Sequence, residues 1–230
     1  MNMSLKLGNS SVKTPYSKMY VGDTLVYTSE APTPYTEVSY LESTGTQYLI
    51  TPVTMSANYD FEIEFQYNDN SVAGYIGGNG YQGTRRVVGG MRFYCPETTV
   101  GYFYYAKYGL ASLARQFVAY TDLLKHKLSF INNALYFDDT LVTDLTGTSF
   151  QYGTDRTFYL FTTPTNNTTT DIQTIALARI YSFSVTDNTT NNKVLDLIPV
   201  LDSENVPCMY DKVSGTFLYN QGTGVFNYGI

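Results

Sequence analysis

The chain has 230 residues, a net charge of −6 at pH 7 and a charged fraction of only 15%. Its 14 lysines and arginines are scattered, which argues against nucleic-acid binding and against adsorption to anionic lipid, since both need clustered basic residues. No stretch approaches the ~20 apolar residues of a membrane span, so membrane insertion is not expected. The 23 tyrosines, with 13 phenylalanines and no tryptophan, favour a β protein with a wet, aromatic surface.

Residues 1–35 are predicted to form a short β-rich arm. Two hairpins are expected there, one in LKLGNSSV around a Gly-Asn turn and one in KMYVGDTLVYT around a Gly-Asp turn. The segment APTPY at 31–35 has two prolines one residue apart, which fix an extended backbone. We therefore predict that a linker ends the arm and that a second domain occupies 36–230.

The second domain is predicted to consist of many short strands. DFEIEFQY alternates polar and apolar residues, and turns are expected at Asn132-Asn133 and at 187–192. Only 110–116 has helix-forming composition, and no repeat of equal period is visible. The pattern predicts an all-β, two-sheet antiparallel jelly-roll sandwich.

The C-terminal segment VPCMYDKVSGTFLYNQGTG is patterned without being reactive. Asp211 can start a turn and Gly215 can take its positive-φ corner. Gly222 and Gly224 permit a tight bend before the last residues. We interpret this segment as a closing β-hairpin whose pattern is turn chemistry.

Three carboxylates, Asp60, Glu62 and Glu64, share one face of the predicted strand DFEIEF. Paired carboxylates are what glycoside hydrolysis needs, so this spacing is compatible with catalysis. The same pattern is also what a solvent-facing strand carries, because the phenylalanines and isoleucine between the acids supply the core face. The second interpretation is favoured, and no catalytic residue is assigned.

The only histidine, His126, has no nucleophile motif beside it, and one histidine with two distant cysteines does not suggest a zinc site. Cys95 and Cys208 are expected to be free thiols, although a disulfide between them is possible. No cofactor is expected, and the one alternative is calcium, held by carboxylate oxygens. Its candidate ligands are Asp138, Asp139, Asp144 and Asp155.

A ligand-binding surface is predicted where tyrosines and arginines gather. The densest aromatic cluster is at 102–108, where alternation sends Tyr102 and Tyr104 to the face opposite Phe103. The nearby loop GYIGGNGYQGTRR combines glycine, tyrosine and arginine, as binding surfaces often do. Simple packing is the alternative for both. The predicted contact residues are Tyr75, Tyr81, Arg85, Arg86, Tyr102 and Tyr104.

Several motifs of the second domain resemble one family. They are YLESTGTQY at 40–48, ARIYSF at 178–183, LIPV at 197–200, PCMYD at 207–211 and NQGTG at 220–224. The segment 37–230 thereby resembles the concanavalin A-like (laminin-G-like) jelly-roll domains of phage and prophage proteins from gut bacteria. The N-terminal LKLGNSSV and KMYVGDTLVY are similar to short units that begin many phage virion accessory and fibre proteins.

The resemblance implies a non-enzymatic virion structural protein, such as a head or tail fibre or a capsid decoration. Its jelly roll would adhere to host or mucosal surface glycans, and the arm would bind other virion proteins. The arm residues expected to attach to the particle are Leu5, Leu7, Val12, Tyr20 and Val21. A homo-oligomer, trimeric by analogy with fibres, is also expected.

The N-terminal residues contain no apolar segment of a secretory signal. We therefore expect a virion protein that is assembled in the host cytoplasm. Two alternatives stay open at this point: a carbohydrate-binding lectin or adhesin of a gut bacterium, and a glycan hydrolase of the same fold.

Overall fold

This computed structural model describes residues 18–21, 24–28, 35–54, 56–69, 72–79, 81–82, 87–88, 91–95, 100–105, 114–119, 123–148, 157–164, 172 and 174–230. Within these ranges, the backbone alone is described at 18–21, 24–28, 81–82, 87–88, 91, 95, 100–101, 104–105 and 114–119. The chain divides into two compact units, Met1–Pro34 and Tyr35–Ile230. Every regular element in the described ranges is a β-strand, so none of them contains a helix that could span a membrane.

The first unit contains one described hairpin. Strand β1 (Lys18–Val21) pairs antiparallel with β2 (Thr24–Thr28), with Tyr20 opposite Leu25. This confirms the hairpin predicted in KMYVGDTLVYT. The other predicted hairpin, in LKLGNSSV, lies outside the described residues, as do the proposed attachment residues Leu5, Leu7 and Val12.

The second unit is built on an 11-stranded sheet, called here the large sheet. Its main path runs β15–β14–β13–β6–β17–β18–β19–β20, and three further strands join it at the side. The main-path strands are β6 (Tyr59–Tyr67), β13 (His126–Ile131), β14 (Ala134–Phe137), β15 (Thr140–Asp144), β17 (Leu177–Asp187), β18 (Asn192–Asp202), β19 (Pro207–Asp211) and β20 (Thr216–Leu218). The side strands are β3 (Tyr35–Glu37), β4 (Tyr40–Thr44) and β21 (Asn227–Gly229).

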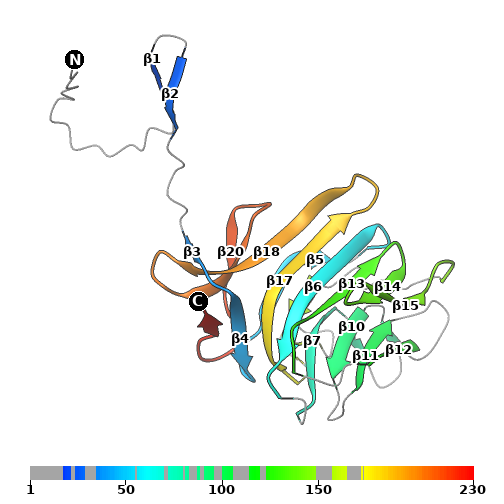
Figure 1. Cartoon of the computed structure of the whole chain (residues 1–230). Coiled ribbons are helices and arrows are strands. Elements are labelled where there is room, and N and C mark those ends of the chain that lie inside the picture. Colours follow the sequence, from blue (N-terminus) through cyan, green and yellow to red (C-terminus); the bar gives the residue numbers. More distant parts are fainter. Residues whose placement is uncertain are drawn as a thin grey trace. The chain divides into compact units, whose positions relative to one another are not determined.

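A six-stranded sheet, the small sheet, packs against the large one in the order β12–β11–β10–β7–β16–β5 (Figure 1). Its strands are β5 (Leu49–Thr54), β7 (Gly74–Gly78), β10 (Met91–Cys95), β11 (Val100–Tyr105), β12 (Ala114–Ala119) and β16 (Thr157–Leu160). A separate two-stranded pair joins β8 (Tyr81–Gln82) to β9 (Val87–Val88). All the strand pairs are antiparallel, which confirms the predicted jelly-roll sandwich. Of the segment with helix-forming composition, residues 114–116 lie in β12, where sheet pairing overrides local propensity, and residues 110–113 lie outside the described residues.

The large sheet forks where β17 and β18 separate. Next to the turn that joins the two strands, residues 183–187 of β17 pair with β18. Farther from this turn, residues 177–180 of β17 pair with β4 instead. On the other branch β3 pairs with the end of β18, and the Val38 N–H donates to the Pro199 carbonyl at 3.1 Å. Strand β21 then pairs with β4, with Gly229 opposite Tyr40. The last strand of the sandwich therefore lies beside β4, its second strand.

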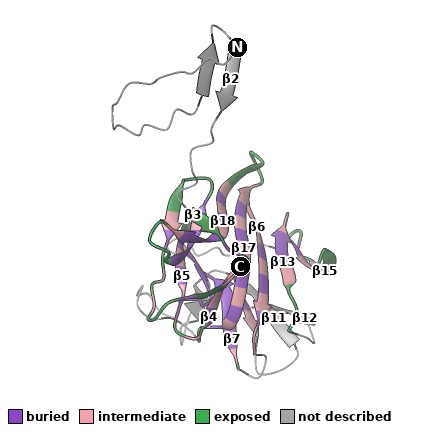
Figure 2. Ribbon diagram, turned by 60° about the vertical axis from the view of Figure 1, so that its left-hand side comes forward, coloured by how far each residue is buried: buried purple, intermediate pink, exposed green. Residues whose placement is uncertain are grey.

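The core lies between the two sheets, and Figure 2 shows buried residues alternating with less buried ones along strands such as β6. Strand β6 alternates strictly, and its buried side chains are Phe61, Ile63, Phe65 and Tyr67, each at most 3% exposed. The Phe61 ring centroid lies 5.7 Å from that of Phe158 and 6.3 Å from that of Phe103, which both belong to the small sheet. Aromatic rings thus bridge the two sheets, and the period-two pattern predicted for DFEIEFQY is confirmed.

The C-terminal turn is organised by one buried carboxylate. Asp211 is 1% exposed; its Oδ1 accepts from the backbone N–H groups of Asp196 (2.9 Å) and Val213 (3.1 Å). Its Oδ2 accepts from the Ser214 hydroxyl at 2.5 Å, and Gly215 takes the positive-φ corner at +74°. Burial opposes ionisation of Asp211, but these hydrogen bonds prevail and lower its pKa. The predicted turn is confirmed.

Two of the motifs that carry the family resemblance meet in space, and we call residues 43–48 together with 220–225 the clasp. Gln47 lies at the centre of the clasp and is 3% exposed. Its Oε1 accepts from the Thr44 N–H at 2.9 Å, and its Nε2 donates to the Val225 carbonyl at 3.1 Å. One buried amide therefore joins segments that lie far apart in the sequence.

The second half of the clasp repeats this arrangement with Asn220. Its Oδ1 accepts from the N–H groups of Tyr48 (3.1 Å) and Gly222 (2.8 Å), while the Thr223 N–H donates to the Thr46 carbonyl at 3.0 Å. A Cβ on Gly222 would lie 1.9 Å from the Thr46 carbonyl oxygen, so only glycine fits there. These motifs close the fold, and their pattern needs no ligand to explain it.

Candidate functional site

The outer face of the small sheet carries an aromatic row. Strand register places Tyr94 of β10 opposite both Tyr75 of β7 and Tyr102 of β11. Phe93 and Phe103 are 3% and 0% exposed in the core, so Tyr94 and Tyr102 lie on the opposite face of their strands. The ring centroids of Tyr75 and Tyr94 are 4.5 Å apart. The predicted alternation of Tyr102 and Phe103 is confirmed.

Arg92 lies beside this row. Its guanidinium carbon is 5.2 Å from the centroid of the Tyr75 ring, within the range of a cation–π contact. Arg92 is 5% and Tyr75 is 9% exposed, so the half-buried Tyr94 and Tyr102 offer the accessible area among the described side chains of the row. Sequence reasoning missed Arg92 and Tyr94, although their alternation with Phe93 in MRFYC was the signal that could have found them.

The other predicted contact residues are only partly described. Tyr104 pairs through its backbone with Arg92, which continues the register of β11 against β10. Tyr81 lies in β8, where its backbone pairs with Val88. Arg85 and Arg86 lie outside the described residues. The structure therefore brings Tyr75 and Tyr102 onto one sheet face and leaves the others as predictions.

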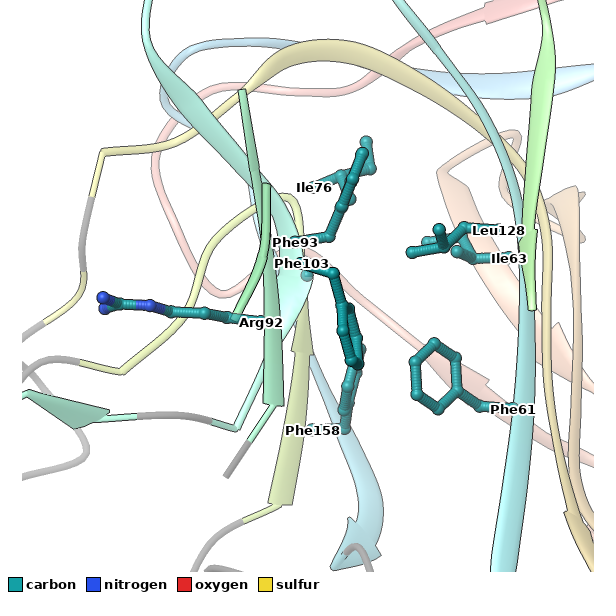
Figure 3. A pocket seen from close by; sticks show the side chains of 9 residues that line it. Phe61, Ile63, Ile76, Arg92, Phe93, Phe103, Leu128 and Phe158 are labelled. Carbon is teal, nitrogen blue, oxygen red and sulfur yellow. The ribbon is translucent and has the colours of Figure 1, made fainter. Parts of the chain in front are cut away.

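A small void lies between the sheets, lined by core side chains (Figure 3). Its volume is about 10 Å³, and its lining includes Phe61, Phe103 and Phe158. In Figure 3 the Arg92 side chain points away from it, toward the other face of the small sheet. A space of this size holds about one water molecule, so the interior offers no ligand cavity at this position.

The outer face of the large sheet carries the acidic row predicted from DFEIEF. Asp60, Glu62 and Glu64 alternate with the buried residues of β6, so the shared face of the three carboxylates is confirmed. Glu64 pairs with Lys125 at 2.8 Å, and Glu62 accepts from the Ser129 hydroxyl at 3.2 Å. The side chains of Glu62 and Glu64 are 45% and 38% exposed. These contacts and exposed fractions are those of a solvated sheet face.

Aromatic and cationic side chains extend this face. The Tyr181 ring lies 4.4 Å from the Lys125 ammonium and 5.5 Å from the Tyr40 ring. Arg179 stacks over Tyr40 at 4.4 Å and pairs with Glu42 at 2.6 Å. Although burial opposes ionisation of Glu42, the hydrogen bond and charge of Arg179 lower its pKa. Strand pairing thus gathers a set of cation–π and ion-pair contacts that sequence reasoning did not identify.

The predicted calcium ligands are engaged in local structure. Asp138 Oδ2 lies 2.7 Å from His126 Nδ1, its Oδ1 accepts from the Lys127 N–H at 2.8 Å, and Asp144 accepts from the Thr146 N–H at 2.8 Å. Asp139 forms an ion pair with Lys127. Asp155 lies outside the described residues. In the part of the chain that is described, no three His, Cys, Asp or Glu side chains are arranged to hold a metal ion.

Cys208 is a free, fully buried thiol in β19. Burial raises its pKa to about 12, so the reactive thiolate is suppressed at neutral pH. Cys208 therefore serves as a small apolar core residue. The side chain of Cys95 lies outside the described part of β10, and the predicted free state is established for Cys208 alone.

No protein-family model matches the chain, and no curated protein sequence matches it either.

Proposed function

We propose that the chain is a non-enzymatic structural protein of a bacteriophage particle, a head or tail fibre or a capsid decoration, whose sandwich adheres to surface glycans. The observation that carries the proposal is the division of the chain into a short unit with its own β-hairpin and a separate sandwich. An attachment element followed by a binding domain is the organisation that the phage resemblance implies.

The adhesive part of the proposal rests on the half-buried aromatic side chains of both sandwich faces. Tyr94 and Tyr102 on the small sheet, and Tyr40 and Tyr181 on the large one, combine an apolar ring with a polar hydroxyl. Such side chains stack on sugar rings and also suit wet protein interfaces. Shallow sites bind weakly, so several copies on one particle would supply the avidity.

The non-enzymatic part rests on the acidic row. A glycoside hydrolase needs one protonated and one ionised carboxyl group placed on either side of the scissile bond. Glu62 and Glu64 are instead solvated and contact Ser129 and Lys125. A catalytic role for this row is therefore not proposed.

The attachment role is assigned to the first unit. It would bind other virion proteins through Tyr20 and Val21 of β1 and through Leu5, Leu7 and Val12. We also propose that the protein is a homo-oligomer on the particle, as a fibre or decoration would be, and that its site of action is the virion.

The test is mass spectrometry and immunogold labelling of purified particles from the source of the sequence. We expect the full chain at a fixed stoichiometry per particle, with label at one defined position on head or tail. Its absence from every particle, with recovery in the cell envelope, would instead support an adhesin of a bacterium. Release of reducing sugar that is abolished in Glu62→Gln and Glu64→Gln would support the hydrolase.

A further inference from the structure

The large sheet has a hollow on its outer face, at the end of β6 that lies next to two hairpin turns. Its volume is about 180 Å³. The turns are Asn132-Asn133, between β13 and β14, and 188–191, between β17 and β18 (Figure 1). The lining side chains that matter here are Asp60, Glu62, Ile131, Ser184, Thr186 and Asn191.

Strand register explains why these side chains gather. Thr186 and Ser184 of β17 lie directly opposite Asp60 and Glu62 of β6. All four point away from the core, because they alternate with buried residues on both strands. Asn191 joins them from the hairpin turn, where it takes the left-handed backbone conformation at φ +57°. The hollow is therefore a product of the pairing of β6 with β17.

Only some of these polar groups are used within the protein. Asp60 Oδ1 accepts from the Asn132 N–H at 2.9 Å and from Asn188 Nδ2 at 3.3 Å, which fixes the carboxylate. In the described part of the chain, its Oδ2 has no hydrogen-bond donor, and the Ser184 and Thr186 hydroxyls and the Asn191 amide make no hydrogen bond. A positioned acceptor and three groups that can donate and accept thus face solvent together.

We propose that this hollow binds one neutral sugar residue. Sugar hydroxyls can donate to the Asp60 and Glu62 carboxylates while they exchange hydrogen bonds with the hydroxyls and the amide. The apolar side chain of Ile131 offers contact to the C–H face of a ring. The volume is below the 300–1,000 Å³ of drug-sized pockets, which favours a single ring over a chain of sugars.

The charge of the hollow selects against other ligands. An anionic ligand would face the two carboxylates, and two cations beside the hollow are already paired. Lys127 is 3.8 Å from Glu62 and is also paired with Asp139, and Lys193, opposite Thr186, pairs with Asp196 at 2.9 Å. A divalent cation needs oxygens that converge to 2.3–2.6 Å. In the described part of the chain, no three His, Cys, Asp or Glu side chains gather at this hollow to supply them. A neutral polyol is the ligand that uses both the donors and the acceptors.

The experiment is an NMR titration of the full ¹⁵N-labelled chain with the methyl glycosides of glucose, galactose, mannose and N-acetylglucosamine. For at least one of them we expect saturable shifts at residues 60–62, 131–132 and 184–191. In Asp60→Asn, which can keep the bond from Asn132, the affinity should fall at least about tenfold, since bonds to charged groups are the strong ones. In Thr186→Val, which removes a neutral hydroxyl, the affinity should fall by a smaller factor, about fivefold. Ser182→Ala is the matched control, because Ser182 lies on the same face of β17 but bonds to Glu64 at 3.4 Å, outside the hollow.

No shift at the hollow with any glycoside at about 50 mM, far above a millimolar Kd, would overturn the inference. Shifts confined to Tyr94 and Tyr102 would overturn it too, because the sugar would then bind the small sheet. Saturable shifts at the same amides with calcium chloride alone would identify a cation site instead.

The inference deepens the proposed adhesive function and rests on it for its biological role. Particles that contain the chain without sugar binding would contradict only the inference, and sugar binding without particles would contradict only the virion assignment.

Discussion

The clasp and the hollow are two polar clusters of the same sandwich that use their polar groups in opposite ways. In the clasp, the amides of Gln47 and Asn220 bond to backbone groups of their own segment and of the facing segment. In the hollow, Ser184 and Thr186 face solvent without an internal partner in the described chain. The sequence motifs that look most specific belong to the clasp. The hollow comes from residues of ordinary appearance that register brings together.

This difference separates two reasons for a polar pattern. A buried side-chain amide without hydrogen-bond partners would lower the free energy of unfolding, so the stability of the fold explains why the clasp residues bond to one another. An exposed hydroxyl costs little when it is unpaired, so the hollow residues are not explained by stability. The specific-looking sequence motifs of the clasp therefore serve to close the fold. The polar side chains of the hollow, which bond to no group in the described chain, are instead the ones that point to a binding site.

The largest effect is expected for Gly222→Ala in the clasp. The new Cβ would lie 1.9 Å from the backbone oxygen of Thr46, which cannot move as a side chain can. We expect a loss of about 3 kcal/mol or more in the free energy of unfolding, measured by urea denaturation. Gly147→Ala is the control, because its new Cβ meets nothing within 4 Å. The only cost there is the left-handed backbone at φ +81°, which should lower the free energy of unfolding by about 1–2 kcal/mol. An equal loss in both variants would show that the close approach is unimportant.

The next effect is expected for Asp211→Asn, a buried group with its bonds satisfied like those of the clasp. The change should cost about 2 kcal/mol at pH 7, because charged acceptors make the stronger hydrogen bonds. The folded pKa of Asp211 lies below the unfolded value. Its stabilisation is therefore full above the unfolded pKa, about 3.9, and is lost as pH falls through the folded pKa.

Urea denaturation of both proteins from pH 7 to pH 2 measures this prediction. The difference in unfolding free energy between wild type and Asp211→Asn should be constant down to about pH 4 and then shrink. A difference that stayed constant to pH 2 would mean that the carboxylate charge contributes nothing.

An effect of similar size is expected for Gln47→Leu. The variant keeps the apolar volume but leaves the Thr44 N–H and the Val225 carbonyl without their partner. We expect a loss of about 1–3 kcal/mol in the free energy of unfolding. Gln221→Leu is matched to it, since this exposed amide donates only to the carbonyl of Tyr219. It should change stability by less than about 0.5 kcal/mol, and a similar cost in both would remove the distinction between clasp and surface.

The smallest effect on stability is expected in the hollow. Thr186→Val should change the free energy of unfolding by no more than about 0.5 kcal/mol, because its hydroxyl bonds to no other group in the described chain. Ser129→Ala should cost about 1 kcal/mol, because Ser129 is 2% exposed and donates to Glu62. Thermal denaturation of both variants compares them. A larger loss for Thr186→Val would mean that the hollow is built for stability.

The alternation of β6 and the turns at Asn132-Asn133 and Gly215 were predicted from the sequence because each depends on local chemistry. Side chains alternate along any strand, and positive φ favours glycine and asparagine wherever it is required. The strand β12 was not predicted at residues 114–116, which have helix-forming composition, because its pairing with β11 is a contact between separate segments. The fork of the large sheet was missed for the same reason.

The candidate sites follow the same division. Alternation correctly placed Tyr102 on the face opposite Phe103, and alternation with Phe93 could have placed Arg92 and Tyr94 in the same way. Their contacts with Tyr75 could not be predicted, because Tyr75 lies on a different strand. The acidic row of β6 was predicted, but the hydroxyls that complete the hollow come from β17, more than 120 residues later. No local pattern around Ser184 or Thr186 could indicate that they lie opposite Glu62 and Asp60.

The sequence by itself determined the all-β class, the alternation of each strong strand and the turns between them. These properties depend on the steric and hydrogen-bonding preferences of neighbouring residues. The tertiary structure decided which strands pair and in what register, because those choices depend on burying one shared core. It thereby made YLESTGTQY and NQGTG into a clasp, and it turned dispersed carboxylates, hydroxyls and an amide into a hollow.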